Sequence, residues 1–195
     1  MWFTKHIKHE SINFFFTIFL SNFTISAQAQ NINTETSTIH WLGKKIGGQH
    51  EGFIGIKTGQ LDVENEKITS GSFIINMTSI TNTDLTDEGY NQKLVGHLNS
   101  DDFFGVEKYP NAKLEIKKAT SFSNGKASVN ANLTIKGKTE SVLFDVLKTD
   151  RGYTAKIDVD RSKFDVRYGS DSFFDNLGDN VIDDIFTLDI TLFLK

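Results

Sequence analysis

The chain has 195 residues, 38% of them hydrophobic, and a formal net charge of −4 at pH 7. This mildly acidic balance argues against nucleic acid as a partner, because nucleic-acid binding needs a basic face. The chain contains no cysteine, which excludes disulfides and thiolate chemistry.

Residues 1–29 have the order of a secretory signal peptide. Lys5 and Lys8 precede an apolar block over residues 12–25, and small residues follow up to Ala29. The block is shorter than the ~20 residues that a membrane-spanning helix needs. We therefore predict cleavage after Ala29 rather than a membrane anchor, and a periplasmic or secreted protein.

Residues 30–195 remain after this cleavage and have the length of one domain. Their formal net charge is −5, because two basic residues and one acidic residue precede them. No other stretch is long and apolar enough to span a bilayer, so we predict no integral membrane segment in the mature chain.

Alternation of apolar and polar residues predicts about eight strands separated by turns such as Asn124-Gly125. One face of each strand is apolar and the other polar, which is typical of antiparallel strands with one solvated face. A sandwich and a closed barrel both give this alternation, and a barrel has the advantage of leaving no edge strand. In chain order, the strands contain Ile39 and Trp41; Ile54 and Ile56; Phe73, Ile75 and Met77; Ala112, Leu114 and Ile116; residues 127–135; Val142, Phe144 and Val146; residues 153–159; and residues 186–194.

Two segments break the strand pattern. Tyr90, Leu94 and Leu98 are spaced by four residues, which predicts a short helix over residues 86–98. We expect this helix to cross the mouth or the side of the sheet. The second segment, residues 161–183, is a long insertion rich in Asp, Gly and Phe before the last strand.

The predicted inward side chains carry no charge and no histidine. An eight-stranded barrel lies at the border between a filled core and a cavity for one ligand, so the pattern leaves both open. The inward set is Trp41, Phe73, Ile75, Met77, Leu114, Ile116, Val129, Ala131, Leu133, Phe144, Tyr153, Ala155, Ile157, Phe186, Leu188 and Ile190.

Two aromatic pairs, Phe103-Phe104 and Phe173-Phe174, each follow a turn rich in Ser and Asp. Adjacent phenylalanines in a loop seldom both face water, so we expect them to plug an end of the barrel. They would form either a lid that only closes the core or a mobile lid over an entrance.

Residues suited to catalysis do not cluster in this sequence. His40, His50 and His97 fit no metal-binding spacing, and the acidic pairs Asp101-Asp102 and Asp183-Asp184 lie in turn-like sequence. We therefore predict no catalytic residue, no metal and no cofactor, and a protein that is not an enzyme.

Three ordered motifs resemble those of the YceI family. The segment 97–104, followed by Tyr109-Pro110, is similar to the hallmark segment of that family. Residues 133–139 resemble its second motif, a strand that runs into a tight turn. Parts of residues 161–179 resemble a subgroup variant of its third region, and the likeness extends over residues 37–195.

The resemblance implies an extended, lipocalin-like antiparallel barrel of eight strands with one short helix and an elongated apolar interior. It also implies a tunnel, lined by the inward set, that holds a polyisoprenoid or a similar long-chain amphiphilic lipid, and an exported carrier. The predicted mouth and lid residues are His97, Phe103, Phe104, Arg167, Tyr168, Phe173 and Phe174. The alternative is a filled barrel that serves as a protein-interaction or stress-response module without a lipid. A homodimer is compatible with either function.

Overall fold

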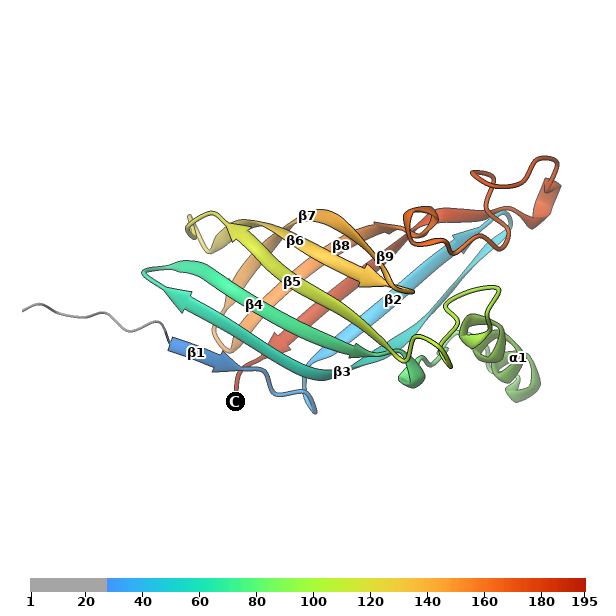
Figure 1. The fold of residues 1–195 in the computed structure, drawn as a ribbon. Helices are drawn as coiled ribbons and strands as arrows, with labels where there is room; N and C mark the ends of the chain where they lie inside the picture. Colours follow the sequence, from blue (N-terminus) through green and yellow to red (C-terminus); the bar gives the residue numbers. More distant parts are fainter. Residues whose placement is uncertain (1–27) are drawn as a thin grey trace, which may run out of the picture.

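The computed structural model describes residues 28–195, so the predicted signal peptide lies outside the described residues except for its last two positions. The described chain forms nine strands, one α-helix and three short 3-10 turns (Figure 1). These elements are β1 (Gln28–Asn31), β2 (Thr38–Lys45), β3 (Gly48–Glu64), β4 (Lys67–Asn76), η1 (Met77–Ser79), α1 (Glu88–Asn99), β5 (Asn111–Ala119), β6 (Lys126–Ile135), β7 (Lys138–Thr149), β8 (Gly152–Asp160), η2 (Arg161–Phe164), η3 (Gly178–Asn180) and β9 (Ile182–Phe193).

Strands β2 to β9 form one closed antiparallel ring. Each strand pairs with its neighbour in the chain, β2 pairs with β9, and the sheet has the order β3-β2-β9-β8-β7-β6-β5-β4 before β3 pairs with β4. The predicted eight-stranded, lipocalin-like barrel is therefore confirmed, and all eight predicted strands are present.

The ninth strand, β1, was not expected from the sequence. Its four residues pair with residues 60–63 of β3, beyond the stretch of β3 that pairs with β2. Strands β2 and β1 therefore pair with β3 one after the other along its length. Strand β3 has 17 residues and is long enough to pair with both. A strand of sequence QAQN has too few residues, and too few apolar ones, to show an alternating pattern.

Tight hairpins connect most neighbouring strands. At Asn65-Glu66, Asn124-Gly125 and Lys136-Gly137, both central residues have a positive φ. This is the conformation that matches the right-handed twist of paired strands, and it favours Asn and Gly. The predicted turn signals at residues 124–125 and 136–138 therefore fix where the β5–β6–β7 meander reverses.

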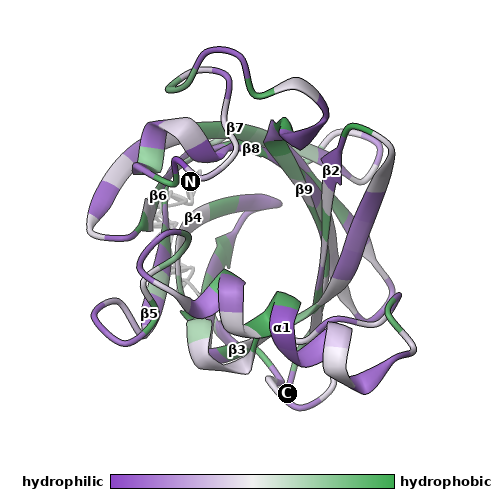
Figure 2. Cartoon of the chain, turned by 90° about the vertical axis from the view of Figure 1, so that its right-hand side faces the viewer, coloured by the Kyte–Doolittle hydropathy of each residue, from purple (hydrophilic) through white to green (hydrophobic). Residues whose placement is uncertain are grey.

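Helix α1 lies at one end of the barrel, opposite the end that holds β1 and the C-terminus (Figure 1). Seen from that end, it borders the ring of strands on one side (Figure 2). Asp87 caps its first turn by accepting a hydrogen bond from the backbone N–H of Tyr90. Leu98 is buried and Leu94 packs against the core, but Tyr90 is exposed, so only two of the three residues of the predicted apolar stripe face the barrel.

The segment between η1 and α1 runs back along β3. The N–H groups of Thr81 and Thr83 donate to the carbonyls of Phe53 and Glu51 at 2.9 and 3.0 Å. Gly52 allows this close approach, because a Cβ atom at Gly52 would lie 1.9 Å from the carbonyl oxygen of Thr81. This glycine therefore sets the position of the segment that leads into α1.

We expect Gly52→Ala to lower the free energy of unfolding by about 2 kcal/mol or more, because the new methyl group must displace a hydrogen-bonded backbone segment. Gly43→Ala is the matched control. Gly43 lies in the adjacent strand with nothing within 4 Å of the added methyl group, so its stability should change by less than about 1 kcal/mol. Urea unfolding of both variants tests this, and equal midpoints would contradict it.

Candidate functional site

The barrel interior contains two apolar chambers that follow one another along its axis. Both are lined by Ile39, Ile75, Leu133 and Leu188, so the two chambers adjoin. The chamber nearer β1 has an empty volume of about 750 Å³ and the chamber nearer α1 about 840 Å³.

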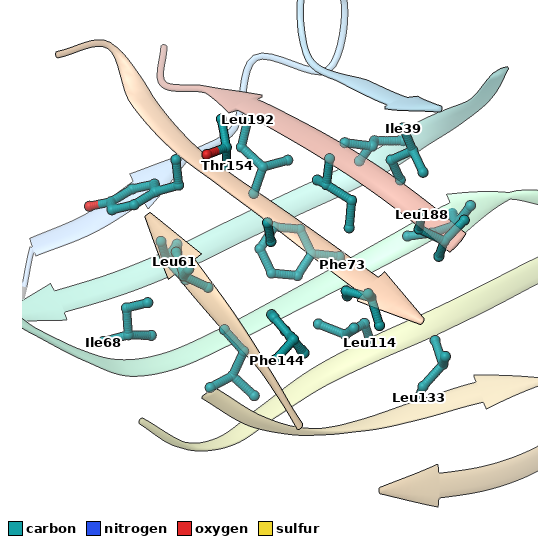
Figure 3. A pocket seen from close by; sticks show the side chains of 18 residues that line it. Ile39, Leu61, Ile68, Phe73, Leu114, Leu133, Phe144, Thr154, Leu188 and Leu192 are labelled. Atoms are coloured by element: carbon teal, nitrogen blue, oxygen red, sulfur yellow. The ribbon is translucent and has the colours of Figure 1, made fainter. Parts of the chain in front are cut away.

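Side chains in the middle of the barrel keep part of their surface uncovered. Ile75, Leu114, Ile116 and Phe144 line the first chamber (Figure 3), yet they are only partly buried. Protein interiors are close-packed, and such side chains would be fully buried in a filled core. The sequence left a filled and a hollow barrel open, and the structure has a hollow one.

Fourteen of the sixteen predicted inward residues line one chamber or both. The exceptions are Val129 and Ala131 of β6, which are fully buried among other side chains and border no cavity. The fourteen are Trp41, Phe73, Ile75, Met77, Leu114, Ile116, Leu133, Phe144, Tyr153, Ala155, Ile157, Phe186, Leu188 and Ile190. Contact of these residues with a ligand stays a prediction.

Buried side chains surround the β1 end of the cavity. Ile32 and Ile68 are buried there, next to Tyr153. Burial raises the pKa of Tyr153, and its hydroxyl donates to Oε1 of Gln30 at 3.0 Å. Strand β1 supplies Gln30 and leads to Ile32, so it packs behind the side chains that line this end of the cavity.

The α1 end is bordered by one of the two predicted aromatic pairs. Phe103 is buried, and Phe103 and Phe104 both line the second chamber. Phe173 and Phe174 are exposed and line neither chamber. The expectation that Phe173-Phe174 plugs the barrel is therefore wrong: the segment carrying it turns outward, and Phe173 stacks with the Arg167 guanidinium 5.0 Å from its ring centre.

The polar residues predicted at the mouth lie outside the cavity. The ring of His97 packs edge-on against Tyr168, with 4.3 Å between centroids, and against Phe103. Tyr168, Arg167 and Phe174 border an open polar depression on the outer surface. His97, Arg167, Tyr168 and Phe174 line neither apolar chamber, so of the predicted mouth and lid set only Phe103 and Phe104 lie at the cavity wall.

Besides Asp183, one charged residue borders the cavity, Arg161, and it was not predicted as a site residue. Its side chain is 2% exposed and lines the second chamber. Its guanidinium donates to the backbone carbonyls of Val166, Tyr168, Ile182 and Asp183 at 2.8–3.0 Å. Nη2 also lies 3.3 Å from Oδ1 of Asp184.

Burial lowers the pKa of Arg161, whereas Asp184 and other nearby carboxylates raise it, and a guanidinium stays charged in proteins. Arg161 therefore ties the insertion between β8 and β9 to the barrel end. In the sequence, Arg161 stands out only as a charged residue directly after strand β8. Four of its five partners are backbone carbonyls, and a pattern of residue types does not reveal such partners.

Lys136 acts in the same way at the β6–β7 turn. Its Nζ donates to the carbonyls of Asp101, Phe103 and Asp165 at 2.9–3.2 Å. One lysine thus joins the loop that carries the Phe103-Phe104 pair to the segment that follows η2. Together with Arg161, it fixes the loops that frame the α1 end of the cavity.

Two further findings concern residues 28–195 alone. His, Asp and Glu side chains do not gather there in a group of three or more that could hold a metal ion. The single α-helix of that part is too short and too polar to cross a membrane.

The chain matches the family model of the YceI-like domain over residues 23–194 and belongs to the YceI family. A search of the curated proteins found no match.

Solved structures share the fold. BcnA from Burkholderia cenocepacia is 23% identical with a TM-score of 0.65, covering 83% of this chain and 98% of BcnA. A polyisoprenoid-binding domain from Saccharophagus degradans, implicated in plant cell wall breakdown, is 12% identical with a TM-score of 0.56, covering 87% and 99%. A YceI protein from Campylobacter jejuni is 17% identical with a TM-score of 0.51, covering 98% and 91%.

We expect Arg161→Met to lower the free energy of unfolding by about 3 kcal/mol or more, because it leaves Asp184 and several carbonyls without their partner. Arg167→Met is the control. Its side chain is 58% exposed and pairs with Asp165, and surface ion pairs contribute about 1 kcal/mol at most. Thermal unfolding of both variants measures the difference, and similar losses would contradict the anchoring role of Arg161.

Proposed function

We propose that this chain is an exported carrier that holds a polyisoprenoid or a similar long-chain amphiphile inside its barrel. The observation that carries the proposal is the pair of adjoining chambers in the barrel, whose walls are apolar from Tyr153 near one end to Phe103 and Phe104 near the other. Membership of the YceI family and a fold shared with a polyisoprenoid-binding domain support it.

The length of the cavity suits a chain better than a compact molecule. Its two chambers meet at the shared side chains of Ile39, Ile75, Leu133 and Leu188. Burying each CH₂ group of a lipid tail is worth about 0.8 kcal/mol. A tail that runs through both chambers therefore gains affinity from every segment, without any polar contact along its length.

The signal-peptide pattern of residues 1–29 supports export.

A carrier needs no catalytic group. The walls of the cavity offer no acid–base pair, since the only ionisable side chains that border it besides Tyr153 are Arg161 and Asp183. Arg161 already donates hydrogen bonds to four carbonyls and forms an ion pair with Asp184. We therefore propose binding without chemistry. The alternative, a protein-interaction module with a filled barrel, does not account for the empty space inside this barrel.

The protein exported to a bacterial periplasm and purified without detergent should carry a long-chain lipid at one molecule per chain. Native mass spectrometry combined with organic extraction measures this and identifies the lipid class. A chain that is isolated empty, and stays empty when challenged with polyprenols, polyprenyl phosphates and fatty acids, would overturn the proposal.

Ala155→Trp should weaken lipid binding by more than tenfold while the barrel stays folded. Ala155 lines the first chamber and is only partly buried, so a larger side chain fills empty space instead of displacing packed atoms. Excluding two CH₂ groups of the tail costs about 1.6 kcal/mol, which is more than tenfold in Kd. Lys156→Trp, at the exposed next position, should bind lipid normally. Equal retention of lipid by both variants in native mass spectrometry would contradict a tail in this chamber.

A further inference from the structure

Strands β7 and β8 form the shortest ladder of the ring. They pair over four residues each, from Val146 opposite Ala155 to the hairpin that joins them, whereas β7 has ten pairs with β6 and β8 has nine with β9. From Val146 and Ala155 toward the α1 end, the two strands part. Residues 138–145 of β7 and residues 156–160 of β8 keep their other neighbours but do not pair with each other. The hydrogen-bonded wall of the barrel is therefore interrupted between them.

The turn η2 borders the wide side of this gap. It follows β8 directly and lies next to both β7 and β9. Just after η2, Asp165 contacts the β6–β7 hairpin: its carbonyl accepts from Nζ of Lys136 at 3.2 Å, and its Oδ1 lies 3.7 Å from Nζ of Lys138. The gap therefore has three sides, which are residues 138–145, residues 156–160 and η2, and we call it the window.

Side chains fill the window where the ladder is missing. Phe164 of η2 and Val166 are 1% and 0% exposed, and they belong to the same core cluster as Ile157 of β8. Phe144 of β7 packs against that cluster. Packed side chains can rotate aside and return while the backbone keeps its hydrogen bonds, whereas an opening elsewhere in the wall has to break a run of ladder bonds. The window is therefore the part of the wall that opens at the lowest free energy.

The window lies between the first chamber and the outer surface. Phe144 (Figure 3) and Ile157 stand on opposite rims of the window, and both line the first chamber. On the outer face of the β7 rim, Leu143 is 75% exposed, more than any other large hydrophobic side chain of residues 28–195. A hydrocarbon tail at this surface meets Leu143 and then Phe144, so apolar groups border its path into the chamber.

We propose that the window is the portal through which a lipid tail enters and leaves the barrel, and that the side chain of Phe164 is its plug. This inference rests on the proposed function, because a portal needs a ligand that moves. The hydrogen bonds of Arg161 and Lys136 hold the backbone near the window, so rotation of the Phe144 and Phe164 side chains is the motion that opens it. The tail then passes through the side of the barrel and not through either end.

Trp41 gives a measurement of ligand exchange. It lines the second chamber and donates from Nε1 to the carbonyl of Thr81 at 3.0 Å, and the only other tryptophan, Trp2, lies in the predicted signal peptide. Geranylgeraniol serves as the probe. Stopped-flow fluorescence of the delipidated exported protein gives the association rate, and mixing of the loaded protein with empty phosphatidylcholine vesicles gives the dissociation rate.

Phe164→Leu should raise the association and dissociation rates of geranylgeraniol by about threefold or more, because a smaller plug lowers the barrier in both directions. The Kd should change by less than about twofold, because Phe164 lines neither chamber. Phe122→Leu is the matched control. Phe122 also lines neither chamber and stacks on Tyr153 near the β1 end, so the same substitution there should leave both rates unchanged.

A cross-link over the window tests the same route should Phe164→Leu not fold. The chain has no cysteine, so Leu143→Cys combined with Asp158→Cys places the only two thiols on the outer faces of opposite rims. Joining them with a bismaleimide should slow uptake and release of geranylgeraniol by about tenfold or more and leave the Kd unchanged. Asp158→Cys combined with Thr187→Cys is the matched control. These two positions face each other in the intact β8–β9 ladder, and the same reagent there should not slow exchange.

Three results separate the conclusions. Equal exchange rates in the two cross-linked proteins, or equal rates in Phe164→Leu and Phe122→Leu, would overturn the portal and leave the carrier function standing. Slower exchange only in the protein that is linked over the window, with its Kd unchanged, supports both. If geranylgeraniol neither changes the Trp41 emission of the unmodified protein nor is retained in native mass spectrometry, the carrier function fails and the portal fails with it.

Discussion

The ladder between β3 and β4 is the interaction on which the rest of the structure depends. It joins the two ends of the strand order and turns a twisted sheet into a barrel. Closure removes nearly every long free edge and forces the apolar face of each strand inward. Eight strands leave more room inside than these side chains fill, so the closed ring creates the cavity, and loops at its two ends decide what the cavity can hold.

The strands and the walls of the cavity could be predicted from the sequence because both follow from local alternation. Residues such as Leu114, Phe144 and Leu188 occupy the apolar face of a strand, and that face has to point inward once the ring closes. Whether the ring is filled depends on how side chains from opposite walls meet. Phe73 and Ile116 would lie on the apolar face of their strands in a hollow barrel and in a filled one. Whether the interior is empty can therefore be seen only in the structure.

The barrel ends were harder to predict because irregular backbone places their residues. Phe103-Phe104 and Phe173-Phe174 follow similar turns, yet the first pair packs over the cavity and the second faces solvent. Lys136 donates to two carbonyls of the first loop, those of Asp101 and Phe103, and the alternation of residue types gives no sign of these bonds. Arg161 was missed for the same reason, since its partners are mostly carbonyls that any residue type provides.

The pairing of β2 with β9 has a consequence for the order of folding. It connects residues 38–45 to residues 182–191, and the chain next to β1 also bonds to Phe193. Contacts between segments so distant in sequence slow folding, because a long loop must be ordered before they form. The meander from β4 to β8 can form from local hairpins, whereas β2 cannot form its ladder with β9 until β9 is present. The barrel therefore closes only when the C-terminal strand is available, and until then its apolar face stays accessible to whatever surrounds the emerging chain.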